Sequence, residues 1–198
     1  MRKKTAVTMI LVMTFFIILS AAIAGCSSQA PPASPVPVNN LSTIEPSMMA
    51  LQLSDLPGKF TVVESADRTR SEMRQWSLDH GWKKGYNAVF QKNGSASVTV
   101  VSQYISIYPY ENMSVVLEDT AMQARSWADE NVSVDEISPP VIGDSRNAFK
   151  ISEKGSPIQD FVIVFVKKDV YEELSVNGTV ADYDVLRQLA DVAAAKIK

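Results

Sequence analysis

The feature that most constrains the fold is the uninterrupted apolar run at residues 161–166, which reads Phe-Val-Ile-Val-Phe-Val. Its β-branched and aromatic side chains are typical of a strand. Successive side chains of a strand point to opposite faces of the sheet, so both faces of this strand must be covered by other elements. We therefore expect a central strand with helices packed on both faces of its sheet.

Turn signals indicate how the neighbouring strands are joined. Asn93 and Gly94 form a strong hairpin signal between predicted strands at residues 82–91 and 96–108. Residues 167–169 turn the chain from the apolar run into a partner strand at residues 170–176. Hairpins imply an antiparallel sheet. Further strands are predicted at residues 51–53, 60–63, 132–137 and 148–152.

Three segments carry helical spacing, at residues 66–79, 111–131 and 182–196. In the first, Thr69, Met73 and Trp76 share one face, and Gly81 suits the position after its last turn. The apolar stripe of the second is Met113, Leu117, Ala121, Ala124 and Ala128, and that of the third is Tyr183, Leu186, Leu189, Ala193 and Ile197. The predicted fold class is α+β, with residues 46–198 as a single globular domain.

The N-terminal residues 1–25 are predicted to be a signal peptide or membrane anchor. Arg2, Lys3 and Lys4 precede an apolar run without charge, which ends in small residues. This order is typical of a secretory signal. Residues 26–45 are predicted to be a disordered tether, because the segment from 27 to 40 holds four prolines and no charged residue.

The end of the leader resembles the lipobox of prokaryotic lipoproteins, those of archaea included. The resemblance covers Ile23, Ala24, Gly25 and Cys26 and implies cleavage before Cys26 and a lipid on its sulfur. Cys26 is the only cysteine, so it cannot form an internal disulfide. Retention of the leader as a single-pass helix is the alternative. In both cases we expect the domain on the extracytoplasmic face of the cell membrane, held there by the lipid or helix.

Charge excludes one class of partner. Without the three basic residues of the leader, 16 of the 19 Lys and Arg remain against 22 Asp and Glu, a formal charge of −6. An acidic domain without a basic run is expected to bind nucleic acid poorly. The expected partner is therefore an envelope protein or a small ligand.

Five of the eight asparagines begin an Asn-x-Ser/Thr sequon, where chance predicts about one. They are Asn40, Asn93, Asn112, Asn131 and Asn177. Sequons are used only on exported chains, so we interpret them as possible N-glycosylation sites of a glycoprotein.

A second resemblance covers residues 51–198. It consists of a Leu-Pro-Gly turn at 56–58, Gly81 with Trp82, Gly85 with Tyr86, Gly143 with Asp144, and an apolar hairpin before the last helix. This pattern is similar to small exported lipoprotein domains with the α/β/α sandwich fold of the PsbP type. The resemblance implies a binding or accessory role and supplies no functional residues.

The sequence predicts no catalytic residue, metal site or cofactor. His80 is the only histidine, and it falls at the end of a predicted helix, where the helix dipole favours a cation. Zinc sites and His-dependent catalytic sets need further His or Cys partners. Acidic residues that could hold a hard cation are Asp129, Glu130, Asp135, Glu136 and Asp144, but their spacing matches no defined loop.

One cluster suggests ligand contact. Cationic and aromatic side chains lie close together in the sequence at Arg74, Trp76, Trp82, Lys84 and Tyr86. Aromatic faces beside cations can bind sugars or anionic groups, although aromatics at regular spacing also commonly belong to the core. The predicted function is a non-enzymatic, lipid-anchored binding or accessory domain of the cell envelope. A carboxylate-based envelope hydrolase and a structural envelope protein are the alternatives.

Overall fold

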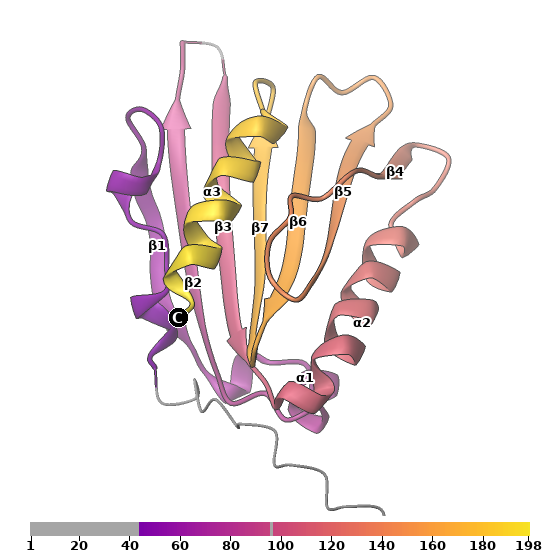
Figure 1. The fold of residues 1–198 in the computed structure, drawn as a ribbon. Coiled ribbons are helices and arrows are strands. Elements are labelled where there is room, and N and C mark those ends of the chain that lie inside the picture. Colours follow the sequence, from indigo (N-terminus) through magenta and orange to yellow (C-terminus); the bar gives the residue numbers. More distant parts are fainter. Residues whose placement is uncertain (1–43, 96) are drawn as a thin grey trace, which may run out of the picture. The chain divides into compact units, whose positions relative to one another are not determined.

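The computed structural model describes residues 44–95 and 97–198, and Figure 1 shows its fold. The predicted leader, Cys26, Asn40 and most of the predicted tether lie outside the described residues. Within the described part of the chain, no helix is long and apolar enough to cross a membrane.

Seven strands form one antiparallel sheet in the order β1-β2-β3-β7-β6-β5-β4. The strands are β1 Thr61–Arg68, β2 Lys84–Asn93, β3 Val98–Ile107, β4 Val132–Glu136, β5 Ser145–Glu153, β6 Gln159–Lys167 and β7 Val170–Gly178. The helices are α1 Gln75–Asp79, α2 Met113–Ser126 and α3 Tyr183–Lys196. The α+β class and the antiparallel sheet are thus confirmed.

The apolar run lies in β6, and its residues 161–166 are all buried. Its odd-numbered residues belong to a core cluster that includes Leu186 and Leu189 of α3. Its even-numbered residues belong to a second cluster that includes Val116 and Leu117 of α2. This division follows from the alternation of side chains along a strand. Figure 1 shows α3 lying across the strands and α2 beside β5 and β6.

The second and third predicted helices are present. Met113, Leu117 and Ala121 are buried on α2, which ends at Ser126, so the predicted continuation of its stripe to residue 128 is wrong. At the start of α3, the carboxylate of Asp182 accepts a hydrogen bond from the Asp184 amide, which satisfies one of the free N–H groups of the first turn.

The predicted helix at residues 66–79 is wrong over most of its length. Strand β1 continues to Arg68, a 3₁₀ helix follows at Arg70–Glu72, and only α1 is α-helical. Pairing with β2 decides this, because Arg68 lies opposite Gly85 in the ladder. Strand β1 is an edge strand with exposed side chains, so it lacks the alternation of apolar residues that identifies a half-buried strand.

The predicted strand at residues 51–53 is also wrong, since Leu53–Asp55 forms a 3₁₀ helix. Leu51 instead packs in the core cluster of α3. Its amide donates a 2.7 Å hydrogen bond to Gln103 Oε1, a buried side chain of β3. This segment therefore docks on the sheet through packing and the Gln103 bond, and Lys196 of α3 adds bonds to the Ala50 carbonyl oxygen and to Asp55.

Candidate functional site

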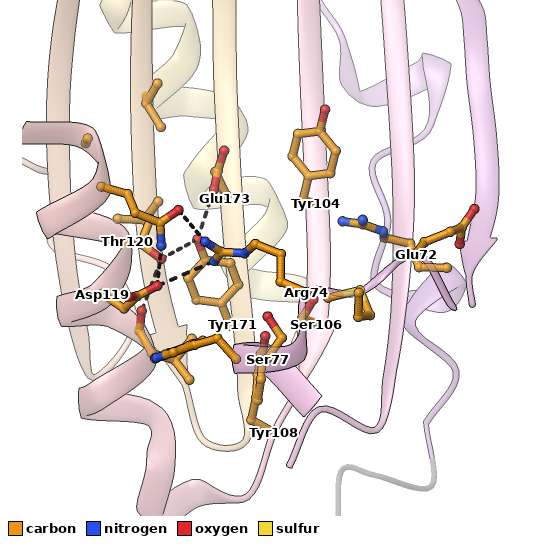
Figure 2. Close-up of a pocket in the computed structure, with 18 of the residues that line it drawn as sticks. Glu72, Arg74, Ser77, Tyr104, Ser106, Tyr108, Asp119, Thr120, Tyr171 and Glu173 are labelled. Atoms are coloured by element: carbon orange, nitrogen blue, oxygen red, sulfur yellow. Dashed lines mark hydrogen bonds and ion pairs between the residues drawn. The ribbon is translucent and has the colours of Figure 1, made fainter. Parts of the chain in front are cut away.

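A cavity of about 360 Å³ opens on the α2 face of the sheet (Figure 2). Strands β3, β6 and β7 contribute side chains to it, α2 borders it on one side, and the segment from Arg68 to Ser77 borders it on the other. Helix α2 packs against β5, β6 and β7, whereas Asn87 of β2 and Tyr104 of β3 are only half-buried on the same face. The cavity therefore lies where the helical cover of the sheet ends.

Local hydrogen bonds shape the segment that borders the cavity. The Thr69 amide and hydroxyl donate to Glu72 Oε2 at 2.6 and 2.8 Å. These bonds, the amide first, hold the pKa of Glu72 below its usual value. Further along, Nδ1 of His80 lies 2.8 Å from the Trp76 carbonyl oxygen, and the two rings stack with centroids 3.9 Å apart. His80 thus has a structural role that positions Trp76 at the cavity.

Arg74 crosses from this segment to α2. Its Nη1 donates to Gln123 Oε1 at 2.7 Å, and its Nη2 lies 3.4 Å from Asp119 Oδ2 (Figure 2). The Arg74 side chain is 60% exposed, so this ion pair contributes at most about 1 kcal/mol to stability. Its main effect is to position a guanidinium group at the cavity and to join the two borders.

The cavity also contains a chain of hydrogen bonds that joins Thr120, Tyr171 and Glu173. The Tyr171 hydroxyl donates to Glu173 Oε2 at 2.9 Å and lies 3.1 Å from the Thr120 hydroxyl. Burial raises the pKa of Glu173, although the Tyr171 hydrogen bond and the charges of Arg68 and Arg74 oppose the rise. Burial, with the Glu173 charge, also raises the pKa of Tyr171. Residues 171 and 173 point the same way because they alternate with Glu172.

Strand β3 adds two tyrosines and a serine. Tyr104 and Tyr108 line the cavity, and burial is the largest cause of the raised pKa of each phenol. Ser106 accepts a 3.2 Å hydrogen bond from the Trp82 ring nitrogen. Aromatic rings next to hydroxyl, carboxyl and guanidinium groups provide both apolar contact and directed hydrogen bonds. The cavity therefore offers both kinds of contact within one volume.

The structure brings two of the five predicted contact residues to this cavity, Arg74 and Trp76. Trp82 is buried in the α2 cluster beside Ser106. The remaining two, Lys84 and Tyr86, belong to the other side of β2: Lys84 pairs with Glu45 at 2.6 Å, and Tyr86 packs against the α3 cluster. Even-numbered positions of β2 share the face of Ala88 and Phe90, which sequence proximity does not reveal.

Several lining residues were not predicted, among them Tyr104, Tyr171 and Glu173. The sequence does contain a signal for Glu173, because Glu172 and Glu173 are adjacent in a predicted strand that pairs with the apolar run. A carboxyl group in such a strand is costly to bury without a partner or a solvated cavity. Glu173 lines the cavity, whereas Glu172 is fully buried on the opposite face of β7, the face that packs against α3.

The acidic residues singled out in the sequence do not converge. Glu136 pairs with Arg125 at 2.6 Å, Asp129 accepts from the amides of the next loop, and Asp144 accepts from the Lys168 amide at 2.7 Å. Glu130 and Asp135 are exposed. In residues 44–95 and 97–198, no group of three or more His, Cys, Asp or Glu side chains is placed to hold a metal ion.

Four of the five sequons fall within the described residues. Asn93 and Asn131 are exposed, whereas Asn112 and Asn177 are half-buried. The Asn112 side-chain amide donates to the His80 carbonyl oxygen at 2.9 Å. Asn177 lies in β7 between Val100 and Asp160 of the neighbouring strands. Their use as glycosylation sites stays a prediction.

Comparison with known proteins gives a fold relative. No family model matches the sequence, and no curated protein matches it. Among solved structures, the extracellular domain of PknH from Mycobacterium tuberculosis is similar, with a TM-score of 0.60. The match covers 76% of this chain and 93% of that domain at 10% sequence identity. At this identity, the likeness establishes a shared fold and nothing about the ligand.

Proposed function

We propose that residues 46–198 form a non-enzymatic binding domain on the extracytoplasmic face of the cell membrane, and that the cavity beside Arg74 binds a small ligand. The observation that carries the proposal is the convergence of aromatic, hydroxyl and charged side chains from separate strands on one cavity of about 360 Å³. Ligand pockets usually measure about 300–1,000 Å³. Such a volume suits a single metabolite better than a polymer segment.

Two further parts of the proposal concern location and architecture. The lipobox-like sequence ending at Cys26 supports a lipid anchor, and the proline-rich tether would hold the domain away from the bilayer. The division of β6 side chains between an α2 cluster and an α3 cluster supports the PsbP-type sandwich with helices on both faces. The extracellular location of the PknH domain is compatible with an exported domain of this fold.

Replacement of Tyr104 by alanine tests the cavity. Tyr104 is half-exposed and lines the cavity, so we expect Tyr104→Ala to fold and to weaken binding about tenfold or more, since aromatic anchors dominate binding energies. The assay is a thermal-shift screen with amino acids, sugars, nucleosides and short fatty acids, followed by calorimetry of each hit. Tyr110→Ala is the matched control, because Tyr110 is 60% exposed and lies outside the cavity. If no class binds, or if both variants bind equally well, the proposed site is wrong.

Intact mass spectrometry of native, membrane-extracted protein tests the anchor. We expect loss of residues 1–25 and an added lipid mass on Cys26, because a lone exported thiol after small residues fits lipoprotein processing. Cys26→Ser is the control and should lack the added mass. A full-length chain with a free thiol would instead establish an uncleaved leader. Hexose-type mass increments would additionally reveal whether the sequons are used.

A further inference from the structure

Two side chains of opposite charge on the cavity wall form no close ion pair among the described residues. Arg68, the last residue of β1, is half-buried and forms no ion pair within 4.0 Å with any acidic side chain of the described residues. The Glu173 side chain makes a single hydrogen bond within the same part of the chain, the one it accepts from the Tyr171 hydroxyl. Both residues line the cavity.

The other charged groups of the cavity already have partners. Arg74 is held by Asp119 and Gln123. Glu72 accepts both of its hydrogen bonds from Thr69. Binding of a charged ligand to these groups would first have to break existing contacts, whereas Arg68 and Glu173 are available. These two residues therefore determine which ligand charges the cavity favours.

The sheet keeps the two charges apart. Arg68 belongs to β1 and Glu173 to β7, and β2 and β3 lie between them. Three strand spacings of about 4.8 Å separate the two backbones by about 14 Å. Tyr104 stands between them, directly opposite Glu173 in the ladder. A ligand on Tyr104 would thus have a cationic group on one side and an acidic group on the other.

Two further acceptors lie on the same face of the sheet but outside the cavity lining: Asn87 on β2, on the Arg68 side of Tyr104, and Asp160 on β6, beyond β7. Asn87 is directly opposite Tyr104 in the β2–β3 ladder, and its Oδ1 is buried without a hydrogen-bond partner in the described residues. Asp160 Oδ1 also has no hydrogen-bond partner in the described residues, and Asp160 shares the face of Glu173 because it lies opposite Asn177 of β7, but it borders a separate hollow with Glu153 and Asn177. Burial, with the nearby Glu173 charge, raises the pKa of Asp160 to about 6. Within the cavity the acceptor with spare capacity is the Glu173 carboxyl group, which favours a ligand that brings hydrogen-bond donors.

We infer that the cavity binds a zwitterionic small molecule, an amino acid or a short peptide, with its ammonium group toward Glu173 and its carboxylate toward Arg68. This inference rests on the proposed function of the cavity. The tyrosine rings would contact the apolar part of the ligand. A ligand with only an anionic group would bring no donor to the Glu173 carboxyl group, and a simple amine would leave Arg68 unpaired.

Matched ligands and matched variants test separately the contact of the ligand's ammonium group with Glu173 and that of its carboxylate with Arg68. The standard L-amino acids and their glycyl dipeptides are titrated into the protein, with binding measured by calorimetry and by the fluorescence of Trp76 and Trp127, which both line the cavity. The best zwitterion is then compared with its decarboxylated amine and its deaminated acid. For L-phenylalanine these are 2-phenylethylamine and 3-phenylpropanoate. The zwitterion should bind at least about tenfold more tightly than either analogue, because each analogue lacks one charge-assisted contact.

Variants that remove one charge of the protein should each weaken the binding of only the ligands that carry the matching opposite charge. Arg68→Gln is expected to weaken the zwitterion about tenfold or more and to leave the amine unaffected. Glu173→Gln is expected to weaken the zwitterion and the amine and to leave the deaminated acid unaffected. The controls are Arg70→Gln and Glu130→Gln, because both residues are exposed and lie outside the cavity. A merely structural role of Arg68 or Glu173 would weaken all three ligands together.

The possible outcomes separate this inference from the proposed function. If a sugar, nucleoside or fatty acid binds in a Tyr104-dependent manner and no amino acid or dipeptide does, the cavity is a binding site but the zwitterion inference is wrong. Equal affinity for the zwitterion and its two analogues would also overturn the inference. If no compound of any class binds, the proposed function fails as well.

Discussion

The wild-type domain is expected to lose stability as the pH rises from about 4.5 to about 8, and the Glu172→Gln variant is expected not to show this loss. Glu172 is fully buried on the α3 face of β7. Gln103 Nε2 donates to its Oε2 at 2.9 Å, and its Oε1 has no hydrogen-bond partner in the described residues. Burial raises the pKa of Glu172 from 4.5 to about 8, although the Gln103 hydrogen bond and two lysine charges oppose the rise.

The sign follows from proton binding. Between pH 4.5 and 8, the folded protein keeps a proton on Glu172 that the unfolded chain releases, so the free energy of unfolding falls with rising pH. Each pKa unit corresponds to about 1.4 kcal/mol, so the full effect is several kcal/mol above pH 8. The neighbouring ammonium groups cannot fully compensate: Lys167 donates to the Ala194 carbonyl oxygen, and Lys196 to Asp55 and the Ala50 carbonyl oxygen.

Denaturant titrations across this pH range measure the effect. Near pH 4.5 the Glu172→Gln variant should match the wild type within about 1 kcal/mol, and above pH 8 it should be the more stable protein by several kcal/mol. Asp160 and Glu173 also have raised pKa values and remain in both proteins, so the comparison isolates Glu172. The exposed Glu130→Gln variant should follow the wild-type curve. Parallel curves for wild type and Glu172→Gln would contradict the assignment of a protonated buried Glu172.

Phe165→Ala is expected to lower the free energy of unfolding by about 3–5 kcal/mol, the usual cost of truncating a buried phenylalanine. Phe165 is fully buried in the interior strand β6, in the core cluster that includes Leu186 and Leu189 of α3. The rigid strand backbone around it cannot close over the lost ring, so a cavity should remain. The measurement is a urea titration in which the midpoint shifts and the slope stays constant.

Two comparisons make the Phe165 result specific. Phe165→Leu should cost clearly less than Phe165→Ala, because most of the apolar volume is kept. Val141→Ala should have almost no effect, since Val141 is 89% exposed. A loss below about 1 kcal/mol for Phe165→Ala would mean that the apolar run is not the centre of the core.

Part of the site could be predicted from the sequence, because local composition placed cations beside aromatics. Arg74 and Trp76 do line the cavity. Lys84 and Tyr86 are close to them along the chain, but they lie on the opposite face of β2. The residues that complete the cavity come from distant strands: Tyr104 and Glu173 are directly opposite in the β3–β7 ladder. No local pattern contains that pairing.

The sequence by itself determined the elements whose apolar side chains repeat at the regular spacing of a strand or a helix. The apolar run of β6, the stripes of α2 and α3, and the hairpin at Asn93 and Gly94 all specify their structure locally. Only the tertiary structure decided that residues 61–68 form an edge strand rather than part of a helix, because the hydrogen bonds that hold β1 come from β2. The cavity likewise depends on the order in which strands pair, since adding β7 beside β3 brings together residues far apart in the chain. Strand pairing is a non-local interaction, so its outcome is set by the packing of the whole sheet.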